Sequence, residues 1–248
     1  MYKLIFFDTE TTGNRELDVL CQIAYKSESE SFVGLYKPSI KIPPEASAVH
    51  HITNKMVADK PSFAESGDLE KIKALFEDEN SVVVAHNAPF DLMMIKKEGI
   101  EPKKFICTLR LARHLDPEEK IERYNLQYLR YLLEIEIDAT AHDALGDVLV
   151  LEKLFERLEN KMKDPLALKG TPPSQAGEDT VIQKMMEISS HPSLFKTIKF
   201  GKYNGKKIED IVRTDRGYLE WLLGEKEKSE QLDEDWIYTL KHYLGKLT

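Results

Sequence analysis

The stretch KLIFFDTETTG, residues 3–13, carries an apolar run directly into two carboxylates. Leu4 to Phe7 are typical of a strand that is buried on both faces of a sheet. Asp8 and Glu10 are two residues apart, so a strand that continues through them projects both side chains from the same face. Two neighbouring carboxylates repel each other unless a cation joins them. The stretch alone fits a metal site and a strand that ends in a solvated loop equally well.

The segments that follow predict an α/β domain with a mixed sheet. The apolar segments DVLCQIAYKS and ESFVGLYKP come at the short spacing of antiparallel strands. An amphipathic helix over 68–80 precedes a second apolar strand, SVVVAHN, and a helix that begins after Asn87. Further helices are expected from near Thr108 and Asn125, with a long one over 143–159. Strands first, and then strand–helix alternation, indicate an α/β fold.

A change in composition divides the chain. Residues 160–180 collect proline, glycine, serine and charges without periodicity, as a linker does. The predicted parts are a main domain over 1–160, a linker over 161–179 and a small α+β module over 180–248. Residues 1–160 contain 20 Lys and Arg against 29 Asp and Glu, which argues against nonspecific coating of nucleic acid. An acidic domain can still act on phosphates if its carboxylates hold metal ions.

Other features of the sequence favour a cytoplasmic protein without membrane association. No apolar run approaches the roughly 18 residues of a membrane helix, and Asp8 and Glu10 come too early for a signal peptide. Cys21 and Cys107 stand in apolar segments without the spacing of a metal site, which is typical of reduced core cysteines.

Two later segments add candidate functional residues. In VVVAHNAPFD, Asp91 falls in the first turn of a helix, where an acidic residue commonly interacts only with the helix dipole. In TAHDALGDVLVLEKLFERL, Asp147 lies one turn before Leu151 on the packing face of a helix. A carboxylate on that face needs a hydrogen-bonding partner or an ion. His142 lies five residues earlier, where a lone histidine would usually be a surface residue.

Together these motifs resemble those of a known enzyme family. DTETTG, HNAPFD and HDALGD, in this order and with HHIT at 50–53, resemble the DEDD superfamily of 3′→5′ exonucleases in its histidine subclass. The resemblance covers residues 1–160 and implies the ribonuclease H-like fold, a mixed five-stranded sheet flanked by helices. Within the superfamily, ASAVHHITNKMVADKP and FICTLRLARHL are similar to segments of the exodeoxyribonuclease X group. FGKYNGKKIEDIVRTDRGYLEWLL resembles the small accessory domain of some members.

The resemblance implies a metal-dependent phosphodiesterase with two Mg²⁺ or Mn²⁺ ions, which prefer oxygen ligands. By analogy, Asp8, Glu10 and Asp147 hold the ion that binds the attacking water. Asp8 bridges to the second ion and Asp91 supports that site. His142 is then the general base, because imidazole titrates near working pH. The implied reaction releases 5′-mononucleotides from DNA 3′ ends in DNA repair or processing. The alternatives are a 3′→5′ exoribonuclease and a proofreading subunit tethered to a polymerase.

The substrate contacts expected from the resemblance follow the first strand and flank Asp91. They are Thr9, Thr11, Thr12, His50, Asn87 and Phe90. A helix cap is the alternative for Asn87, a buried structural histidine for His50 and a core side chain for Phe90.

Two segments bear on the choice of partner. After Gly13, family members that open duplex ends present an apolar wedge, whereas this chain has Asn14 and Arg15. This difference favours single strands or overhangs over blunt duplex ends. Residues 196–216 hold seven Lys and Arg against three Asp and Glu, interleaved with aromatic residues, which suits single-strand binding or the docking of a protein. The family is often dimeric, but no stretch of this chain compels a homodimer.

Overall fold

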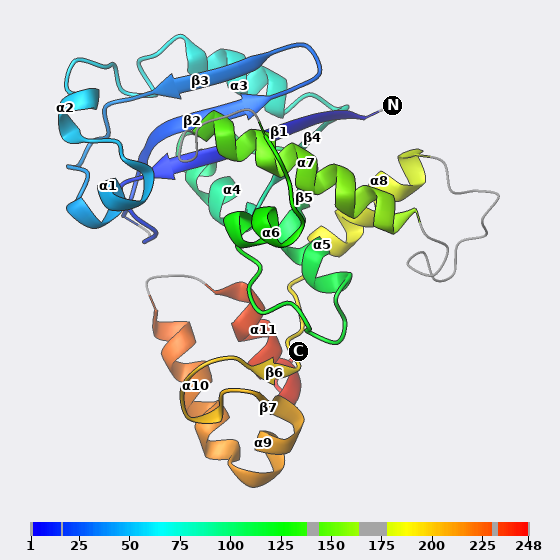
Figure 1. Cartoon of the computed structure of the whole chain (residues 1–248). Coiled ribbons are helices and arrows are strands. Elements are labelled where there is room, and N and C mark those ends of the chain that lie inside the picture. Colours follow the sequence, from blue (N-terminus) through cyan, green and yellow to red (C-terminus); the bar gives the residue numbers. More distant parts are fainter. Residues whose placement is uncertain (1, 16, 138–143, 164–177, 230–232, 248) are drawn as a thin grey trace. The chain divides into compact units, whose positions relative to one another are not determined.

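The computed structural model describes residues 2–15, 17–137, 144–163, 178–229 and 233–247. The chain divides into two compact units, whose elements are labelled in Figure 1. The first unit comprises Met1–Leu115 and Arg123–Ser190, and the second comprises Asp116–Glu122 and His191–Thr248. Within the described ranges, no helix is both long and apolar enough to cross a membrane.

A five-stranded mixed sheet forms the centre of the first unit. Its strands are β1 (Lys3–Thr11), β2 (Leu20–Lys26), β3 (Ser31–Leu35), β4 (Ser81–Ala85) and β5 (Phe105–Cys107). Their order is β3-β2-β1-β4-β5, with β1 antiparallel to β2 and parallel to β4. The β2–β3 pair is antiparallel and the β4–β5 pair is parallel. The predicted mixed sheet is thus confirmed.

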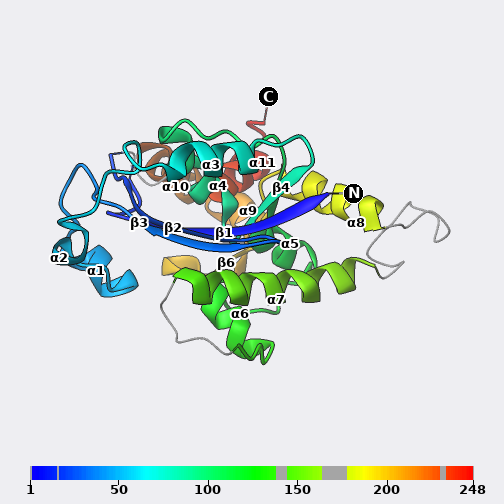
Figure 2. The ribbon, with the colours of Figure 1, turned by 90° about the horizontal axis from the view of Figure 1, so that it is seen from above.

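Helices cover both faces of this sheet, as Figure 2 shows. The helices of the first unit are α1 (Pro44–His50), α2 (Asn54–Val57), α3 (Asp68–Phe76), α4 (Ala88–Lys97), α5 (Thr108–His114), α6 (Leu126–Leu132), α7 (Ala144–Met162) and α8 (Glu178–Ser189). In Figure 2, α3 and α4 lie on one face, and α6 and α7 lie on the other.

The alternation of β1 decides which of its side chains meets which helix layer. Ile5 and Phe7 are fully buried in the core cluster that includes residues of α3 and α4. Phe6 points the other way and packs edge-to-face against Phe155 of α7, with ring centroids 5.3 Å apart. Asp8 and Glu10 share the parity of Phe6, so β1 directs them toward the α7 face. Thr9 shares the parity of Phe7 and is directed toward the α4 face.

Helix α8 belongs to the first unit, so the division of the chain differs from the predicted boundary over 161–179. Ser189, at the end of α8, accepts a hydrogen bond from the Cys107 N–H at 2.8 Å through Oγ. Its carbonyl accepts another at 2.7 Å from Arg110 of α5. Apolar side chains of α8 are buried as well, so α8 continues the core of the first unit and the units divide after Ser190. Within the predicted linker, 164–177 lies outside the described residues.

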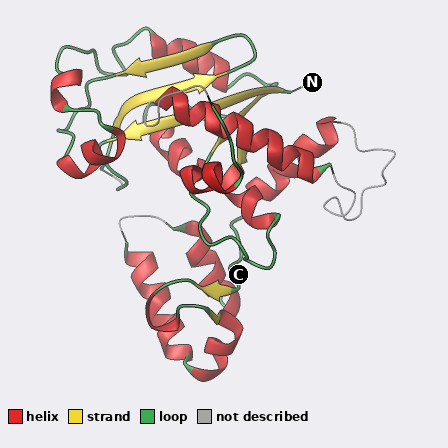
Figure 3. Cartoon of the chain, in the orientation of Figure 1, coloured by secondary structure: helices red, strands yellow, loops and turns green. Residues whose placement is uncertain are grey.

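The second unit is a small α+β module with its own core. It contains β6 (Thr197–Ile198), the 3₁₀ helix η2 (Gly201–Tyr203), β7 (Lys206–Lys207), α9 (Ile208–Thr214), α10 (Arg216–Lys228) and α11 (Glu234–Tyr243). Figure 3 shows that this unit is mainly helical, with one short antiparallel pair of strands. Gly205 precedes β7 with φ at +78°, a conformation that favours glycine. Its core is formed by apolar residues such as Ile198, Ile208 and Leu219.

Candidate active site

The carboxylates of β1 lie where this strand extends past its neighbour β4. The β1–β4 pairing ends at Phe6, whereas β1 continues to Thr11 alongside β2. Asp8 and Glu10 therefore stand in the part of β1 that has no ladder partner on the β4 side. Oxygen atoms of Asp8, Glu10 and Asp147 of α7 all lie within 4.8 Å of one another. The structure thus brings together three acidic residues from one strand and one helix.

A fourth carboxylate approaches β1 from α4. Asp91 lies in the first turn of α4, and its side chain is buried, with 3% exposure. Its Oδ1 accepts hydrogen bonds from the N–H of Thr9 at 3.1 Å and from the Thr9 hydroxyl at 2.6 Å. The α4 turn begins at Asn87, whose left-handed backbone, with φ at 67°, redirects the chain from β4 into the helix. Asp91 is therefore anchored beside Asp8 and is not simply a dipole partner at the helix surface.

Burial and the charges of neighbouring carboxylates raise the pKa values of Asp8 and Glu10, and burial raises the pKa of Asp91. Burial, followed by the charges of Asp91, Glu10 and Asp147, raises the pKa of Asp8 well above its ordinary value. Burial and the charges of Asp147 and Asp91 raise the pKa of Glu10 to about 8. Burial raises the pKa of Asp91 to about 7, although the two bonds from Thr9 oppose the shift. Ionising all four groups is thus unfavourable without a cation.

The chemistry of this donor set fits a hard divalent cation. The converging donors are carboxylate oxygens, which Mg²⁺ and Mn²⁺ prefer over nitrogen or sulfur. A bound cation would offset the cost of burying these charges and the mutual repulsion of Asp8 and Glu10. The cluster therefore has the composition and the electrostatic character of a metal site.

An open cleft of about 230 Å³ surrounds the carboxylates. Its lining residues are Asp8, Thr9, Glu10, His86, Phe90, Asp91, Asn125, Leu126, Gln127 and Asp147. Gln127 of α6 donates a hydrogen bond from Nε2 to Oδ1 of Asp147. The cleft thus joins β1, the start of α4, the start of α6 and the start of α7.

Comparison with known proteins agrees with this geometry. Residues 5–155 match the family model described as Exonuclease, which is more than half of the chain. This chain belongs to the exonuclease family. Residues 198–227 of this exonuclease match the model described as Exodeoxyribonuclease X-like C-terminal. The enzyme is therefore a nuclease of a divalent-metal-dependent family.

Individual relatives cover different shares of this exonuclease. Exodeoxyribonuclease 10 of Escherichia coli (strain K12) is 32% identical over 211 residues, which cover 85% of this chain and 83% of that protein. DNA polymerase III subunit epsilon of Treponema pallidum (strain Nichols) is 33% identical over 163 residues, covering 60% and 73%. A solved structure of Exonuclease X in complex with 5′ overhanging duplex DNA has a TM-score of 0.54 and 27% identity, covering 75% of this chain and 99% of that one. The ribonuclease H-like fold is thus confirmed.

The residues expected to contact substrate fall into two groups: some line the cleft, and the side chains of others form hydrogen bonds elsewhere. Thr9 and Phe90 line the cleft. The Thr11 hydroxyl instead donates to the Gly13 carbonyl at 2.5 Å, and the Thr12 hydroxyl donates to the Asp18 carboxylate at 2.8 Å. The side chains of Thr11 and Thr12 therefore shape the loop after β1.

Two further expected contacts do not line the cleft. His50 is buried, with Nε2 3.2 Å from the Thr11 carbonyl and Nδ1 accepting from the Ile52 N–H at 3.0 Å. Both of its ring nitrogens thus serve backbone groups, as the structural alternative requires. Asn87 is exposed and makes no side-chain capping bond. His142, the expected general base, lies outside the described residues.

Two polar residues of the cleft, Gln127 and His86, are not among the expected functional residues, although His86 opens the HNAPFD motif. Gln127 is the second residue of a helix whose start was signalled only by the cap residue Asn125. His86 donates through Nε2 to the Tyr124 carbonyl at 2.6 Å, and its Nδ1 lies 2.9 Å from the Thr108 hydroxyl. No spacing rule relates residues that lie about 20 or more positions apart, so only the fold could place them in the cleft.

The loop after β1 carries an exposed apolar side chain. Asn14 and Arg15 follow Gly13, and Leu17, two residues after Arg15, has an exposed fraction of 85%. A side chain at Gly13 would approach the Asp18 carboxylate to 2.5 Å, so glycine allows this tight loop. An apolar group is therefore present in the loop, displaced from the position at which the family resemblance predicts it.

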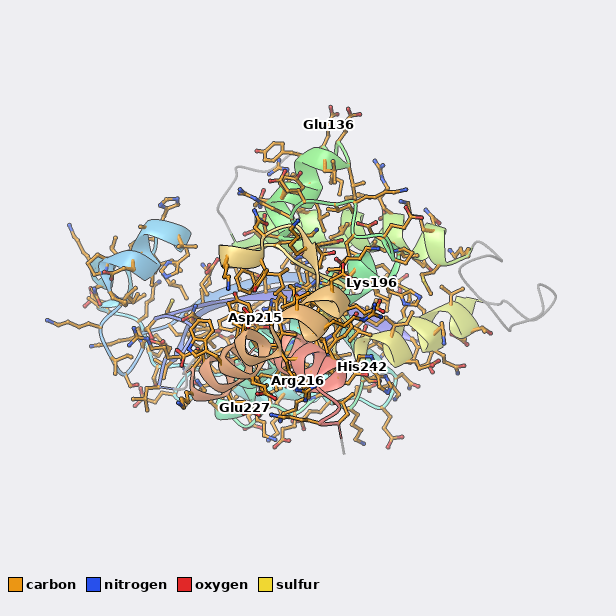
Figure 4. The ribbon with its side chains drawn as sticks, turned by 90° about the horizontal axis from the view of Figure 1, so that it is seen from below. Glu136, Lys196, Asp215, Arg216, Glu227 and His242 are labelled. Atoms are coloured by element: carbon orange, nitrogen blue, oxygen red, sulfur yellow. The ribbon has the colours of Figure 1, made fainter. Side chains whose placement is uncertain are left out.

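The basic residues of the second unit are largely engaged within it. Lys202 pairs with Asp215 at 3.1 Å, and Arg216 with Glu220 at 3.0 Å (Asp215 and Arg216 are labelled in Figure 4). Residues 191–248 contain 11 Lys and Arg against 10 Asp and Glu. With 116–122 included, the second unit is net acidic, so its charge does not favour nonspecific binding of nucleic acid.

Proposed function

We propose that this exonuclease removes 5′-mononucleotides from the 3′ ends of DNA, with two divalent ions, Mg²⁺ or Mn²⁺, in the carboxylate cleft. The observation that carries the proposal is the convergence of Asp8, Glu10 and Asp147, whose oxygens lie within 4.8 Å of one another. Buried Asp91, anchored by Thr9, supplies the fourth carboxylate of the family pattern.

Each carboxylate has a distinct part in this proposal. Asp8, Glu10 and Asp147 would hold one ion, and Asp8 and Asp91 would hold the second. Bound ions supply positive charge that stabilises the entering and leaving oxygens of phosphodiester hydrolysis. The protein's own contribution is orientation, because Thr9 fixes Asp91 and Gln127 fixes Asp147 by hydrogen bonds. These hydrogen bonds fix the orientation of the Asp91 and Asp147 carboxylates before substrate binds, so little reorganisation is required on binding.

His142 is proposed as the general base that takes the proton of the attacking water. It precedes Asp147 by five residues in the HDALGD motif. His86 is the other histidine of the cleft, but its ring nitrogens engage Tyr124 and Thr108. Burial also lowers the pKa of His86 to about 4, so it is a poor proton acceptor at neutral pH. The structure therefore favours a structural role for His86.

The relatives support DNA as the substrate. The relative matched over 83% of its length is named an exodeoxyribonuclease, and the solved Exonuclease X holds 5′ overhanging duplex DNA. The match to an Exodeoxyribonuclease X-like C-terminal segment favours an autonomous nuclease over a proofreading subunit. We extend the proposal to a cytoplasmic enzyme of DNA repair or processing that prefers single strands or overhangs. RNA is the competing substrate that the test must include.

The test uses 5′-labelled single-stranded DNA, blunt duplex DNA and RNA, each incubated with Mg²⁺ and the full chain. A 3′→5′ exonuclease produces a ladder of shortened labelled strands, whereas the opposite polarity releases the label at once as a mononucleotide. We expect a DNA ladder with wild type and none with Asp8→Ala. Cleavage of RNA alone, or immediate release of the label from DNA, would overturn the proposal.

His142→Ala tests the general base separately from the metal site. Removing a general base commonly lowers kcat by about 10²–10⁴-fold. We expect that loss together with unchanged Mn²⁺ affinity, measured by calorimetric titration of the DNA-free protein. Asp147→Ala is the contrasting variant, because it should lose Mn²⁺ binding and activity together. Full activity of His142→Ala would rule out His142 as the general base.

A further inference from the structure

His86 is a polar residue of the cleft that the proposed hydrolysis does not use. It lines the cleft between β4, which ends at Ala85, and α4, which begins at Ala88. Its hydrogen-bond partners Thr108 and Tyr124 both belong to the first unit, as His86 does. Its role can therefore be derived from contacts within that unit alone.

The hydrogen bonds of His86 fix which ring nitrogen carries the proton. Nε2 lies 2.6 Å from the Tyr124 carbonyl oxygen, which can only accept, so Nε2 must donate. Burial lowers the pKa of His86 to about 4, so the ring is neutral near pH 7 and Nδ1 carries no proton. Nδ1 therefore accepts from the Thr108 hydroxyl at 2.9 Å. The ring thus joins the start of α5 to the chain just before α6.

The carbonyl that His86 holds immediately precedes the first turn of α6. Asn125, the next residue, caps this helix by accepting from the Tyr128 N–H at 2.8 Å. The Asn125 carbonyl also accepts from the Leu129 N–H at 3.0 Å, in the backbone pattern of an α-helix. A displacement of the Tyr124 carbonyl should therefore move the start of α6 with it.

Helix α6 buries little of its own surface. It has seven residues, of which only Leu129 is buried, and Tyr131 and Leu132 near its end are exposed. A helix this short gains little stability from its own hydrogen bonds, so its position depends on contacts with the rest of the unit. The hydrogen bond from His86 is one of these contacts, at the end of α6 that faces the cleft.

The start of α6 also carries the residue that orients a carboxylate of the active site, because Gln127 donates to Oδ1 of Asp147. We propose that His86 is a positioning residue for the metal site, which fixes the start of α6 and thereby holds Gln127 against Asp147. The inference rests on the proposed function, in which Asp147 holds a divalent ion. Hydrogen-bond partners of metal ligands fix ligand orientation, and their loss weakens metal binding.

The test compares two amide variants of His86 by Mn²⁺ binding to the full chain without DNA, measured by calorimetric titration. His86→Gln places an amide nitrogen near the position of Nε2, where it can still donate to the Tyr124 carbonyl. His86→Asn keeps a polar group near the position of Nδ1 but is too short to reach that carbonyl. We expect His86→Asn to lower Mn²⁺ affinity on the order of tenfold and His86→Gln to keep most of it. Wild-type affinity in His86→Asn, or an equal loss in both variants, would overturn the proposal.

The Mn²⁺ dependence of activity separates positioning from a part in the chemistry. At limiting Mn²⁺, kcat of His86→Asn on single-stranded DNA should fall together with Mn²⁺ affinity, and saturating Mn²⁺ should restore most of it. A loss of kcat that persists at saturating Mn²⁺ would show that His86 acts in the reaction itself, and its assignment as a positioning residue would then be wrong.

Gln127→Met keeps the size of the side chain but removes the donor to Asp147. It should weaken Mn²⁺ binding about as much as His86→Asn does, and combining the two changes should weaken it no further. Additive losses in the combined variant would contradict a link through Gln127. If Asp8→Asn loses Mn²⁺ binding while His86→Asn keeps it, the link fails and the proposed function stands. Unchanged Mn²⁺ binding in Asp8→Asn would instead reject the metal site itself.

Discussion

At the residue scale, Glu10 shows how the carboxylate cluster affects stability. Burial and the charges of Asp147 and Asp91 raise the pKa of Glu10 from 4.5 to about 8. A carboxyl group with a raised pKa in the folded state binds its proton more tightly there than in the unfolded chain. Stability of the metal-free protein should therefore fall as pH rises from about 4.5 to about 8. A divalent cation in the cluster should remove that loss.

Glu10→Gln removes this titration and one ligand at once. In chelator at pH 8, we expect its melting temperature to exceed that of wild type by a few degrees, since about 1 kcal/mol shifts Tm by roughly 2–4 °C in a chain of this size. The difference should shrink at pH 5. Added Mn²⁺ should raise the melting temperature of wild type more than that of the variant and so reverse the order. Glu28→Gln, at an exposed position, is the control, and identical behaviour of both variants would contradict the prediction.

At the element scale, β1 carries the carboxylates Asp8 and Glu10, and the loop after it presents an exposed leucine. The ladder to β4 ends at Phe6, the register to β2 shifts between Glu10 and Thr11, and the loop then presents Leu17. A leucine that becomes buried against a base pair contributes roughly 1.5–3 kcal/mol. If Leu17 serves as the apolar wedge, this contribution applies to duplex ends and not to single strands.

Leu17→Ser should therefore lower kcat/KM on blunt duplex DNA about tenfold or more, the rate equivalent of roughly 1.4 kcal/mol. Its kcat/KM on single-stranded DNA should stay within about twofold of wild type. Val33→Ser, which changes an exposed apolar residue of β3, controls for loss of surface apolarity. Equal losses on both substrates would show that Leu17 does not act on the duplex end.

At the scale of the whole molecule, α8 determines where the chain can be truncated without destabilising the first unit. Ser189 accepts hydrogen bonds from the Cys107 N–H and from the Arg110 guanidinium. Val181 and Met185 of the same helix are buried. Leaving buried donors without partners costs about 1–3 kcal/mol each. A chain that ends at Lys163 should therefore unfold at a lower temperature and aggregate more readily than one that ends at Ser190. Thermal unfolding and size-exclusion chromatography of the two truncations check this, and indistinguishable behaviour would contradict the role of α8.

The sequence by itself predicted a mixed sheet, most of the helices that flank it and candidate acidic residues for a site. These predictions depend on local signals, because apolar runs, cap residues and the apolar–polar alternation of a strand are patterns of residues that are close together in the sequence. Asp8, Glu10 and Asp147 stood out for the same reason, since they fall at the end of an apolar strand or on a packing face, whereas Asp91 had only the pattern of an acidic residue that interacts with a helix dipole. The family resemblance then joined them into one motif set.

The tertiary structure alone decided which distant residues meet. Gln127 reaches Asp147, His86 holds Tyr124, and α8 joins the first unit, although no local pattern links these positions. The same holds for His50, whose ring serves backbone groups that the chain brings to it only on folding. Hydrogen bonds between remote segments depend on packing geometry, and packing is a property of the whole chain. The carboxylates could therefore be predicted from the sequence, whereas the partners that orient them required the fold.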